Sequence, residues 1–331
     1  MRQPRSALLG VLLLAVAAAP VSAAPPTAAD VARAEHQRIV AYWTADRLAT
    51  AKPRDFTRTG AGFVPAANGK PAGGSKNVAG ASWTKGGKIL HASGKVFFTM
   101  HGARYTCSGS VANDGRASYS LVLTAGHCAY DEGANPPAFA TNWIFIPEYD
   151  TAPGGQDCSA SLLGCWTADA LVVHNGYATA GGFNTQATVH DFAFAVVGAG
   201  GKSRTAQLDS TVGSFAVSTN PLPVNSKLYA FGYPAAGKYS GTDLTYCAGP
   251  VFEDPYNARR TWGMTCDMTG GSSGGPWLSN FTESTGAGVL SSLNSYTYSG
   301  IRAMHGPKFN DNTQAVYAAA DSATSNTIVG Q

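Results

Sequence analysis

Three short segments of the chain carry residues that together can catalyse acyl transfer. They are LTAGHC at residues 123–128, HDFAFAVV at 190–197 and TGGSSGGP at 269–276. A serine hydroxyl becomes a nucleophile when a neutral imidazole takes its proton, and a buried carboxylate holds that imidazole in the required tautomer. The segments supply one residue of each type, so we predict a triad of His127, Asp191 and Ser273.

The surroundings of Ser273 fit the same chemistry. We predict that the backbone N–H groups of Gly271 and Ser273 stabilise the oxyanion. Side chains at Gly270 and Gly271 would crowd such a loop, and glycine adopts the dihedral angles that a tight loop needs. Each segment alone also fits a surface histidine, a turn aspartate or a linker. Their order, with spacings of 64 and 82 residues, favours the catalytic interpretation.

The N-terminus predicts secretion. Arg2 and Arg5 precede an apolar run from Leu8 to Ala19, and small residues follow up to Ala23. This pattern is typical of a signal peptide over residues 1–23. The alternative is a membrane anchor, but the run is shorter than the ~20 residues that a spanning helix needs. We expect an extracellular protein with no membrane partner in its mature form.

Composition points the same way. Only 13% of the 331 residues are charged and 39 are glycine, which suits an extracellular β-protein. The formal net charge of +3 does not favour a nucleic acid as partner. Residues 25–79 hold 8 Lys and Arg against 4 Asp and Glu, whereas residues 80–331 hold 13 against 16. The opposite charges weakly favour association of the two parts.

The region before residue 80 differs from the rest in its predicted secondary structure. Thr27 and Asp30 resemble a capping box, and we predict a helix from there to about Ala51, ended by Pro53. Residues 54–79 have little periodicity and are expected to form a linker. We interpret residues 24–79 as a propeptide of helix plus linker; the alternative is a retained disordered extension.

Residues 80–331 predict an all-β domain, because short β-rich runs alternate with turn residues. A short helix is expected near Thr313–Ser322. The expected strands are Val96–Met100, Ala103–Val111, Ser120–Thr124, Trp143–Ile146, Leu171–His174, Phe192–Val197, Lys227–Phe231 and Gly288–Asn294.

Six cysteines allow 15 disulfide pairings. The simplest joins neighbours in the sequence, although spacing alone does not establish it. A zinc site is disfavoured by the lack of a Cys-x-x-Cys pair and by the predicted secretion. The neighbouring pairs are Cys107–Cys128, Cys158–Cys165 and Cys247–Cys266.

The segments LTAGHC, DFAFAVV and GGSSGGP resemble the three catalytic signatures of the chymotrypsin-like serine peptidases, and the resemblance spans roughly residues 93–309. It implies two six-stranded antiparallel β-barrels with the active site in the cleft between them. It also implies that Cys107–Cys128 holds the histidine loop and that Cys247–Cys266 braces the serine loop. The expected activity is that of a monomeric serine endopeptidase acting on polypeptides, without a metal or cofactor.

The departures from the family concern activation and specificity. Animal members have Asp where this chain has Ser272, and the segment CDMTGGSS is closer to the glutamyl-endopeptidase branch. Activation by removal of the pro-region is therefore expected, with the pro-region as a partner of its own domain. The pro-region around Tyr42-Trp43-Thr44 also resembles those of bacterial secreted members.

Two residues are candidates for the substrate pocket. Asp267 lies six residues before Ser273, where it either binds a basic side chain of the substrate or has a structural role. Ser292 belongs to the Gly288–Tyr296 strand that is expected to form the pocket wall. Glutamyl-specific members have a histidine in that strand, whereas here the histidine that follows Ser273 is His305.

Two other functions compete with this interpretation. Residues 271–275 also match Gly-x-Ser-x-Gly, but the α/β-hydrolase order requires an acid and then a histidine after the serine. Between Ser273 and His305 the sequence offers only Glu283 as that acid. The second alternative is a catalytically inactive homologue that acts as a secreted binding protein. Such a homologue usually lacks a triad residue, whereas all three candidates are present here.

Overall fold

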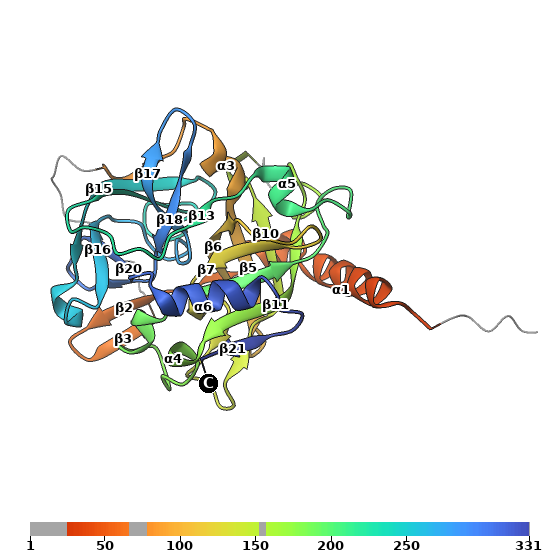
Figure 1. Cartoon of the computed structure of the whole chain (residues 1–331), viewed down its shortest axis with the longest axis horizontal. Helices are drawn as coiled ribbons and strands as arrows, with labels where there is room; N and C mark the ends of the chain where they lie inside the picture. The colour runs from red at the N-terminus through yellow and green to blue at the C-terminus, as the bar shows by residue number, and fades with distance from the viewer. Residues whose placement is uncertain (1–24, 66–77, 152–156, 331) are drawn as a thin grey trace, which may run out of the picture.

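The computed structural model describes residues 25–65, 78–151 and 157–330, which form a mostly β-structure of two barrels (Figure 1). The predicted signal peptide at 1–23 and residues 66–77 of the predicted linker lie outside the described residues. Within the described part of the chain, no helix is both long and apolar enough to cross a membrane.

The first barrel is closed and antiparallel. Its strands follow the order β6-β5-β10-β11-β12-β7, and β7 pairs with β6 to close the barrel. Strands β5, β7 and β12 are buried along their whole length, because one face lines the barrel and helices or the other barrel cover parts of the outside. The strands are β5 Ser93–Met100, β6 Ala103–Ala112, β7 Ser120–Thr124, β10 Thr141–Pro147, β11 Trp166–His174 and β12 Ala193–Val197.

The second barrel has a core of its own, which includes Trp262, Met264 and Trp277. Its strands follow the order β18-β17-β14-β15-β16-β20. Beyond the end of β18, the Ser295 N–H donates to the His305 carbonyl on β20 at 2.8 Å. The strands are β14 Lys227–Gly232, β15 Thr245–Glu253, β16 Thr261–Thr265, β17 Pro276–Thr282, β18 Ala287–Leu293 and β20 Ala303–Pro307.

Two barrels confirm the predicted fold class, and every predicted strand overlaps an observed one. The predicted C-terminal helix is α6, Asp311–Ala320, which packs on β11 and β12 and leads to β21, Thr327–Val329. Shorter elements connect the strands. They are α3 Lys88–Ala92, η1 Gly126–Cys128, β8 Tyr130–Asp131, β9 Ala138–Phe139, η2 Tyr149–Thr151, α4 Asn175–Ala178, η3 Ala187–Val189, α5 Leu208–Val212, β13 Ala216–Val217 and η4 Pro255–Asn257.

The N-terminal helix is confirmed as α1, Ala28–Tyr42, with the predicted capping box between Thr27 and Asp30. It is shorter than predicted, because the Thr44 side chain caps a separate helix, α2 Ala45–Ala49. Helix α1 docks on the first barrel. The Trp43 indole N–H donates to the Asn142 carbonyl at 2.6 Å, and His36 Nδ1 lies 3.0 Å from the Thr167 hydroxyl.

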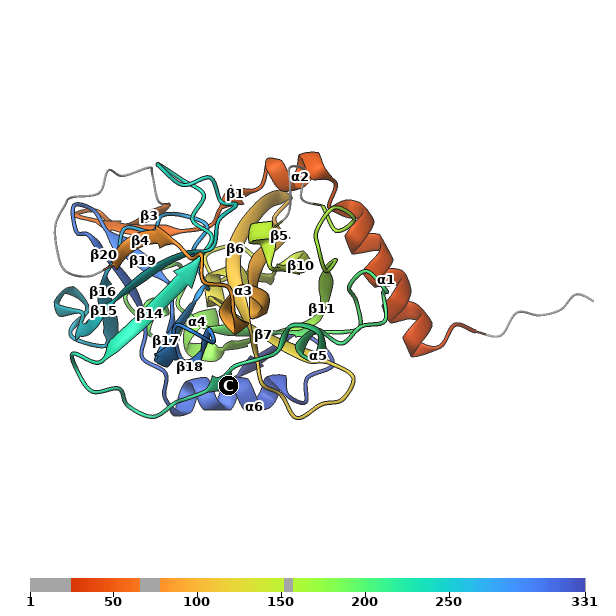
Figure 2. The ribbon, with the colours of Figure 1, turned by 90° about the horizontal axis from the view of Figure 1, so that it is seen from above.

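The expectation of a loose linker is wrong for the described residues after Pro53. These residues form β2, Phe56–Thr59, and β3, Gly62–Pro65, after a short β1, Lys52–Pro53. Strand β1 pairs with β6 of the first barrel, and β2 pairs with β19, Tyr296–Tyr298, of the second. The segment thus crosses from one barrel to the other (Figure 2). Strand β3 pairs with β2 in a local hairpin, whereas the partners of β1 and β2 in the barrels lie far away in the sequence, so local periodicity does not reveal those pairings.

The next described strand is β4, Val78–Ser82, which pairs with β15 of the second barrel. All six cysteines form disulfides between sequence neighbours, as the simplest pairing predicted. Cys107–Cys128 joins β6 to the histidine loop, and Cys247–Cys266 joins β15 to the segment before Ser273. The disulfides therefore hold both ends of the predicted site.

Replacing Cys107 and Cys128 together by serine should lower the free energy of unfolding by roughly 3 kcal/mol, because the unfolded chain regains the freedom of the closed loop. The same change at Cys158 and Cys165 should cost less, since that disulfide closes a sequence separation of 7 rather than 21. Equilibrium unfolding in guanidinium chloride measures both. An equal or reversed order would contradict this prediction.

Candidate active site

His127 lies in the turn η1 directly after β7, and Cys128 ties that turn to β6. Gly126 gives the turn room to form. A Cβ atom at this position would lie 3.1 Å from Asp191 Oδ1 and 3.1 Å from the Tyr177 ring. The small residue before His127 therefore lets the Asp191 carboxylate approach the turn closely.

Asp191 precedes β12 and is fully buried, as is His127. Its Oδ2 atom lies 2.8 Å from His127 Nδ1, and its Oδ1 atom accepts the His127 backbone N–H at 2.9 Å. The Ser295 hydroxyl donates to Oδ2 at 2.5 Å. These hydrogen bonds replace the hydration that the buried carboxyl group loses, and they fix its orientation beside the imidazole. The sequence offered no signal for Ser295.

Other titratable residues near this pair do not replace its members. The His190 ring stacks on His174 at 4.4 Å, and burial, with His174 nearby, lowers the pKa of His190 to about 4. Asp169 lies on β11 with its carboxylate against Gly198. Among the described residues, Asp191 is the acid that hydrogen-bonds to His127.

The loop before β17 holds Ser273 in a conformation that requires glycine on both sides. Gly271 has φ +98° and Gly274 has φ +81°. A Cβ atom would lie 2.7 Å from the Tyr233 carbonyl oxygen at Gly271, and 2.4 Å from the Ser108 carbonyl oxygen at Gly274. Such contacts are too short for any side chain, so the glycines of the predicted motif are required by the backbone.

Asn294 fixes this loop from the second barrel and is fully buried. Its amide group donates to the Phe231 carbonyl at 2.7 Å and the Ser272 carbonyl at 3.0 Å. Its oxygen accepts the Trp277 indole N–H at 2.7 Å. The sequence marked this strand as a pocket wall and did not reveal this anchoring role.

A carboxyl group from the segment between β1 and β2 occupies the space in front of Ser273. The Ser273 hydroxyl donates to Asp55 Oδ1 at 2.5 Å, and the Gly271 N–H donates to Asp55 Oδ2 at 2.8 Å. Burial raises the pKa of the Asp55 carboxyl, and the Ser273 hydrogen bond and the nearby His127 oppose this rise. Sequence reasoning missed Asp55 because it lies in the stretch interpreted as linker.

The structure therefore brings His127 and Asp191 into direct contact and directs the Ser273 hydroxyl to Asp55. His127 Nε2 is buried and has no hydrogen-bond partner among the described residues. One carboxylate bridges the Ser273 hydroxyl and the Gly271 N–H, so these two groups converge on a single point. A carbonyl group placed there would face a nucleophile and an oxyanion donor together, which is the arrangement that acyl transfer needs.

The sulfur atoms beside His127 belong to a disulfide. Cys107, Cys128 and His127 offer atoms within 4.8 Å of one another, a spacing that resembles a metal site. Both sulfurs are consumed by the Cys107–Cys128 bond. Since the thiolate is the form of cysteine that binds a metal, the disulfide accounts for this cluster.

The two candidates for the substrate pocket, Asp267 and Ser292, form hydrogen bonds with other residues of the same chain. Asp267 accepts hydrogen bonds from Tyr239, from Lys238 Nζ at 3.0 Å and from Arg302 Nη2 at 3.1 Å. The Ser292 hydroxyl donates to the Pro307 carbonyl at 2.8 Å and so connects β18 to β20. These contacts favour a structural role for Asp267 over recognition of a basic substrate side chain.

Comparison with known proteins places this geometry in a family. Residues 107–285 match the model of the trypsin-like peptidase domain. The chain belongs to this family. Protease Anisep from Arthrobacter nicotinovorans is 36% identical, with a TM-score of 0.61, and the match covers 74% of this chain and 100% of Anisep. A thermostable serine protease, AL20, from an extremophilic microorganism is 34% identical over 71% of this chain and 99% of its own, with a TM-score of 0.59.

A third solved structure of the trypsin-like fold is that of a Glu endopeptidase. It is 18% identical, with a TM-score of 0.53, and the match covers 75% of this chain and 99% of that one. At this identity the likeness concerns the fold alone. The comparison with curated proteins gives no match.

Replacing Asp267 by asparagine tests its structural role in this trypsin-like domain. The change should cost roughly 1–2 kcal/mol of stability, because Tyr239, Lys238 and Arg302 lose the charged acceptor that they share, while water can hydrate the partly exposed cations that remain. Thermal unfolding measures the loss, with the exposed Asp243→Asn as a control expected to behave like the wild type. A selective loss of cleavage after Lys or Arg, with unchanged stability, would contradict the prediction.

Proposed function

We propose that the chain is a secreted serine endopeptidase that hydrolyses peptide bonds in polypeptides through an acyl-enzyme. His127 is the base, Asp191 orients it, and Ser273 is the nucleophile. Membership of the trypsin-like peptidase family supports the reaction class. The three disulfides and the family are in keeping with an extracellular protein.

The observation that carries this proposal is the convergence of three groups at one place. The Ser273 hydroxyl and the Gly271 N–H meet the same carboxyl group, that of Asp55. The buried His127–Asp191 pair is near enough to influence the pKa of Asp55, and Cys128 Sγ, next to His127, lies 3.9 Å from the Ser273 carbonyl oxygen. A site that positions a hydroxyl and an N–H donor for two oxygens of one group is also shaped for the carbonyl of a substrate. Nothing in this geometry favours the inactive binding homologue.

In the first step, Ser273 Oγ attacks the peptide carbonyl carbon, and His127 Nε2 takes the hydroxyl proton. The carbonyl oxygen becomes an oxyanion, which the Gly271 N–H stabilises. His127 then gives its proton to the departing amine as the peptide C–N bond breaks. In the second step, water attacks the ester carbonyl carbon and gives a proton to His127. His127 then gives this proton to Ser273 Oγ as the ester C–O bond breaks, which releases the acid and regenerates the Ser273 hydroxyl. Asp191 stays ionised and stabilises the imidazolium in both steps.

We further propose that the chain is made as a precursor. Residues 1–23 direct secretion, residues 24–79 are a propeptide, and residues 80–331 are the peptidase domain. The many contacts of residues 28–65 with both barrels support an interaction between the propeptide and its own domain. The mature enzyme is released when the propeptide is cut away.

Labelling with a fluorophosphonate, followed by intact mass, tests the proposal. The processed wild-type chain should gain one adduct, and the Ser273→Ala chain should gain none. The same variant should lower kcat by about 10⁶, the loss seen when a triad nucleophile is removed. The spectrum also gives the mature N-terminus. A correctly processed chain that takes no label would mean that the triad is not functional and would favour the binding protein.

Replacing Asp191 by asparagine should lower kcat by roughly 10⁴, because the amide no longer accepts the proton of His127 Nδ1 and the wrong tautomer results. Asp169→Asn is the matched control, since Asp169 also lies on the first barrel but does not contact His127. Peptide hydrolysis is compared at saturating substrate. Near wild-type activity in Asp191→Asn would remove this residue from the proposed triad.

A further inference from the structure

Residues 52–65 lie across the active-site cleft as an ordered peptide. Strand β1 runs parallel to β6 of the first barrel, with Lys52 opposite Tyr105. Strand β2 runs parallel to β19 of the second barrel, with Phe56 opposite Tyr296. The segment is therefore fixed at both sides of the cleft, and Asp55 falls between the two fixed parts.

Asp55 brings a side-chain carboxylate, and not a main-chain carbonyl, to the reactive point. Its two oxygens accept hydrogen bonds from the Ser273 hydroxyl and the Gly271 N–H. A side-chain carboxyl group, unlike a peptide carbonyl, offers no amine as a leaving group. The segment thus satisfies both groups that the reaction needs without presenting a bond that Ser273 can cut.

The residue after Asp55 covers the base. The Phe56 ring meets the His127 ring edge-on at 5.4 Å and stacks on Phe183 at 4.0 Å. Phe183 meets His127 from another side, also edge-on at 5.4 Å. His127 is fully buried as a result, although a general base must be reachable by the leaving amine and by water. Occupation by this segment is incompatible with turnover.

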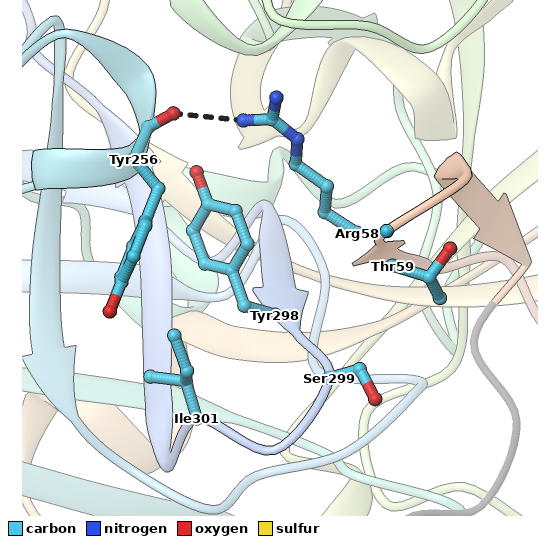
Figure 3. Close-up of a pocket in the computed structure, with 7 residues that line it drawn as sticks. Arg58, Thr59, Tyr256, Tyr298, Ser299 and Ile301 are labelled. Atoms are coloured by element: carbon cyan, nitrogen blue, oxygen red, sulfur yellow. Dashed lines mark hydrogen bonds between the residues drawn. The ribbon is translucent and has the colours of Figure 1, made fainter.

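Two arginines anchor the segment on either side of Asp55. Arg54 Nε donates to the His127 carbonyl at 2.8 Å, and its Nη2 atom lies 3.1 Å from Asp131 Oδ1. At the other end, Arg58 Nη1 donates to the Tyr256 carbonyl at 2.8 Å, and its guanidinium lies 5.8 Å from the centre of the Tyr298 ring (Figure 3). These contacts favour a basic residue directly before the aspartate and another three positions after it.

We propose that the cleft has a second mode of peptide binding, in which a peptide runs parallel to β19 and places an aspartate carboxylate on Ser273 and Gly271. Its ligand class is an Arg-Asp-aromatic peptide, and residues 52–65 are the resident ligand. In this mode the ligand inhibits the enzyme and is not cut. The proposal rests on the proposed function, because it describes inhibition of that activity.

The first experiment compares the rate of fluorophosphonate labelling of the uncleaved chain in the wild type and in Asp55→Ala, resolved by intact mass from the processed chain. The variant should label roughly 10- to 100-fold faster, because the two hydrogen bonds that Asp55 accepts are lost and the relieved desolvation of its carboxyl offsets part of that loss. Asp46→Ala is the matched control, since Asp46 is an exposed acid of the same pro-region. It should label as slowly as the wild type.

The outcomes separate the two proposals. If the processed wild-type chain labels but uncleaved Asp55→Ala stays as slow as the uncleaved wild type, the inhibitory mode is wrong and the proposed function stands. If the uncleaved wild type labels as fast as the processed chain, the inhibitory mode is also wrong. If the processed wild type takes no label, the proposed function fails and this inference fails with it.

A second experiment does not depend on folding of the variant precursor. A synthetic peptide of residues 50–65 is added to the processed wild-type chain, and hydrolysis of a reporter peptide is measured. The wild-type peptide should inhibit competitively and be recovered uncut. The Asp55→Ala peptide should inhibit roughly 10- to 100-fold more weakly. The Lys52→Ala peptide, altered at an exposed side chain, should match the wild type. Equal inhibition by the Asp55→Ala peptide, or cleavage of the wild-type peptide, would overturn the proposal.

Discussion

The buried carboxylate of Asp191 is the constraint on which the rest of the site depends. A charge taken out of water is costly unless hydrogen bonds replace its hydration. Two of its donors belong to His127 in the first barrel. The third is Ser295, which lies between β18 and β19 in the second barrel. The barrels must meet at this point for the anion to be satisfied. The position of the imidazole is therefore set by the joining of the two halves of the fold.

The same hydrogen-bond donors that suit catalysis also suit the proposed inhibition by Asp55. Groups arranged to receive negative charge on a substrate oxygen receive the carboxylate of Asp55 equally well. Desolvation of Asp55 opposes its binding, as the raised pKa of this carboxyl shows, and the hydrogen bonds from Ser273 and Gly271 offset part of that cost. The arginines beside Asp55 contact the domain through Asp131 and the Tyr256 carbonyl, so attraction is spread over several weak contacts.

The two-barrel arrangement came from the resemblance to the chymotrypsin-like peptidases, whereas local sequence signals predicted an all-β domain, the C-terminal helix, the capping box of α1 and the segments that hold His127 and Asp191. Those features depend on short-range patterns such as alternation, caps and glycine-rich loops. The strands at 56–65, the contacts of Asp55 and the roles of Ser295 and Asn294 depend on partners up to 240 residues away. No periodicity encodes such a partner. The linker was misjudged because its hairpin of β2 and β3 shows no clear alternation of apolar residues, and because the hairpin is held in place by pairing with β19 of the second barrel.

The docking of α1 has a consequence for timing. Trp43 and His36 hold this helix on the first barrel independently of the connection to β4. In the proposed precursor, a cut between Pro65 and Val78 would change the connectivity of the chain without emptying the cleft. While the helix stayed docked, Asp55 would remain at the high effective concentration of a tethered ligand. The proposed inhibition would then end at the rate at which the fragment dissociates. Return of the fragment would depend on dilution, so the volume into which the protein is released would decide whether the cleft stays open.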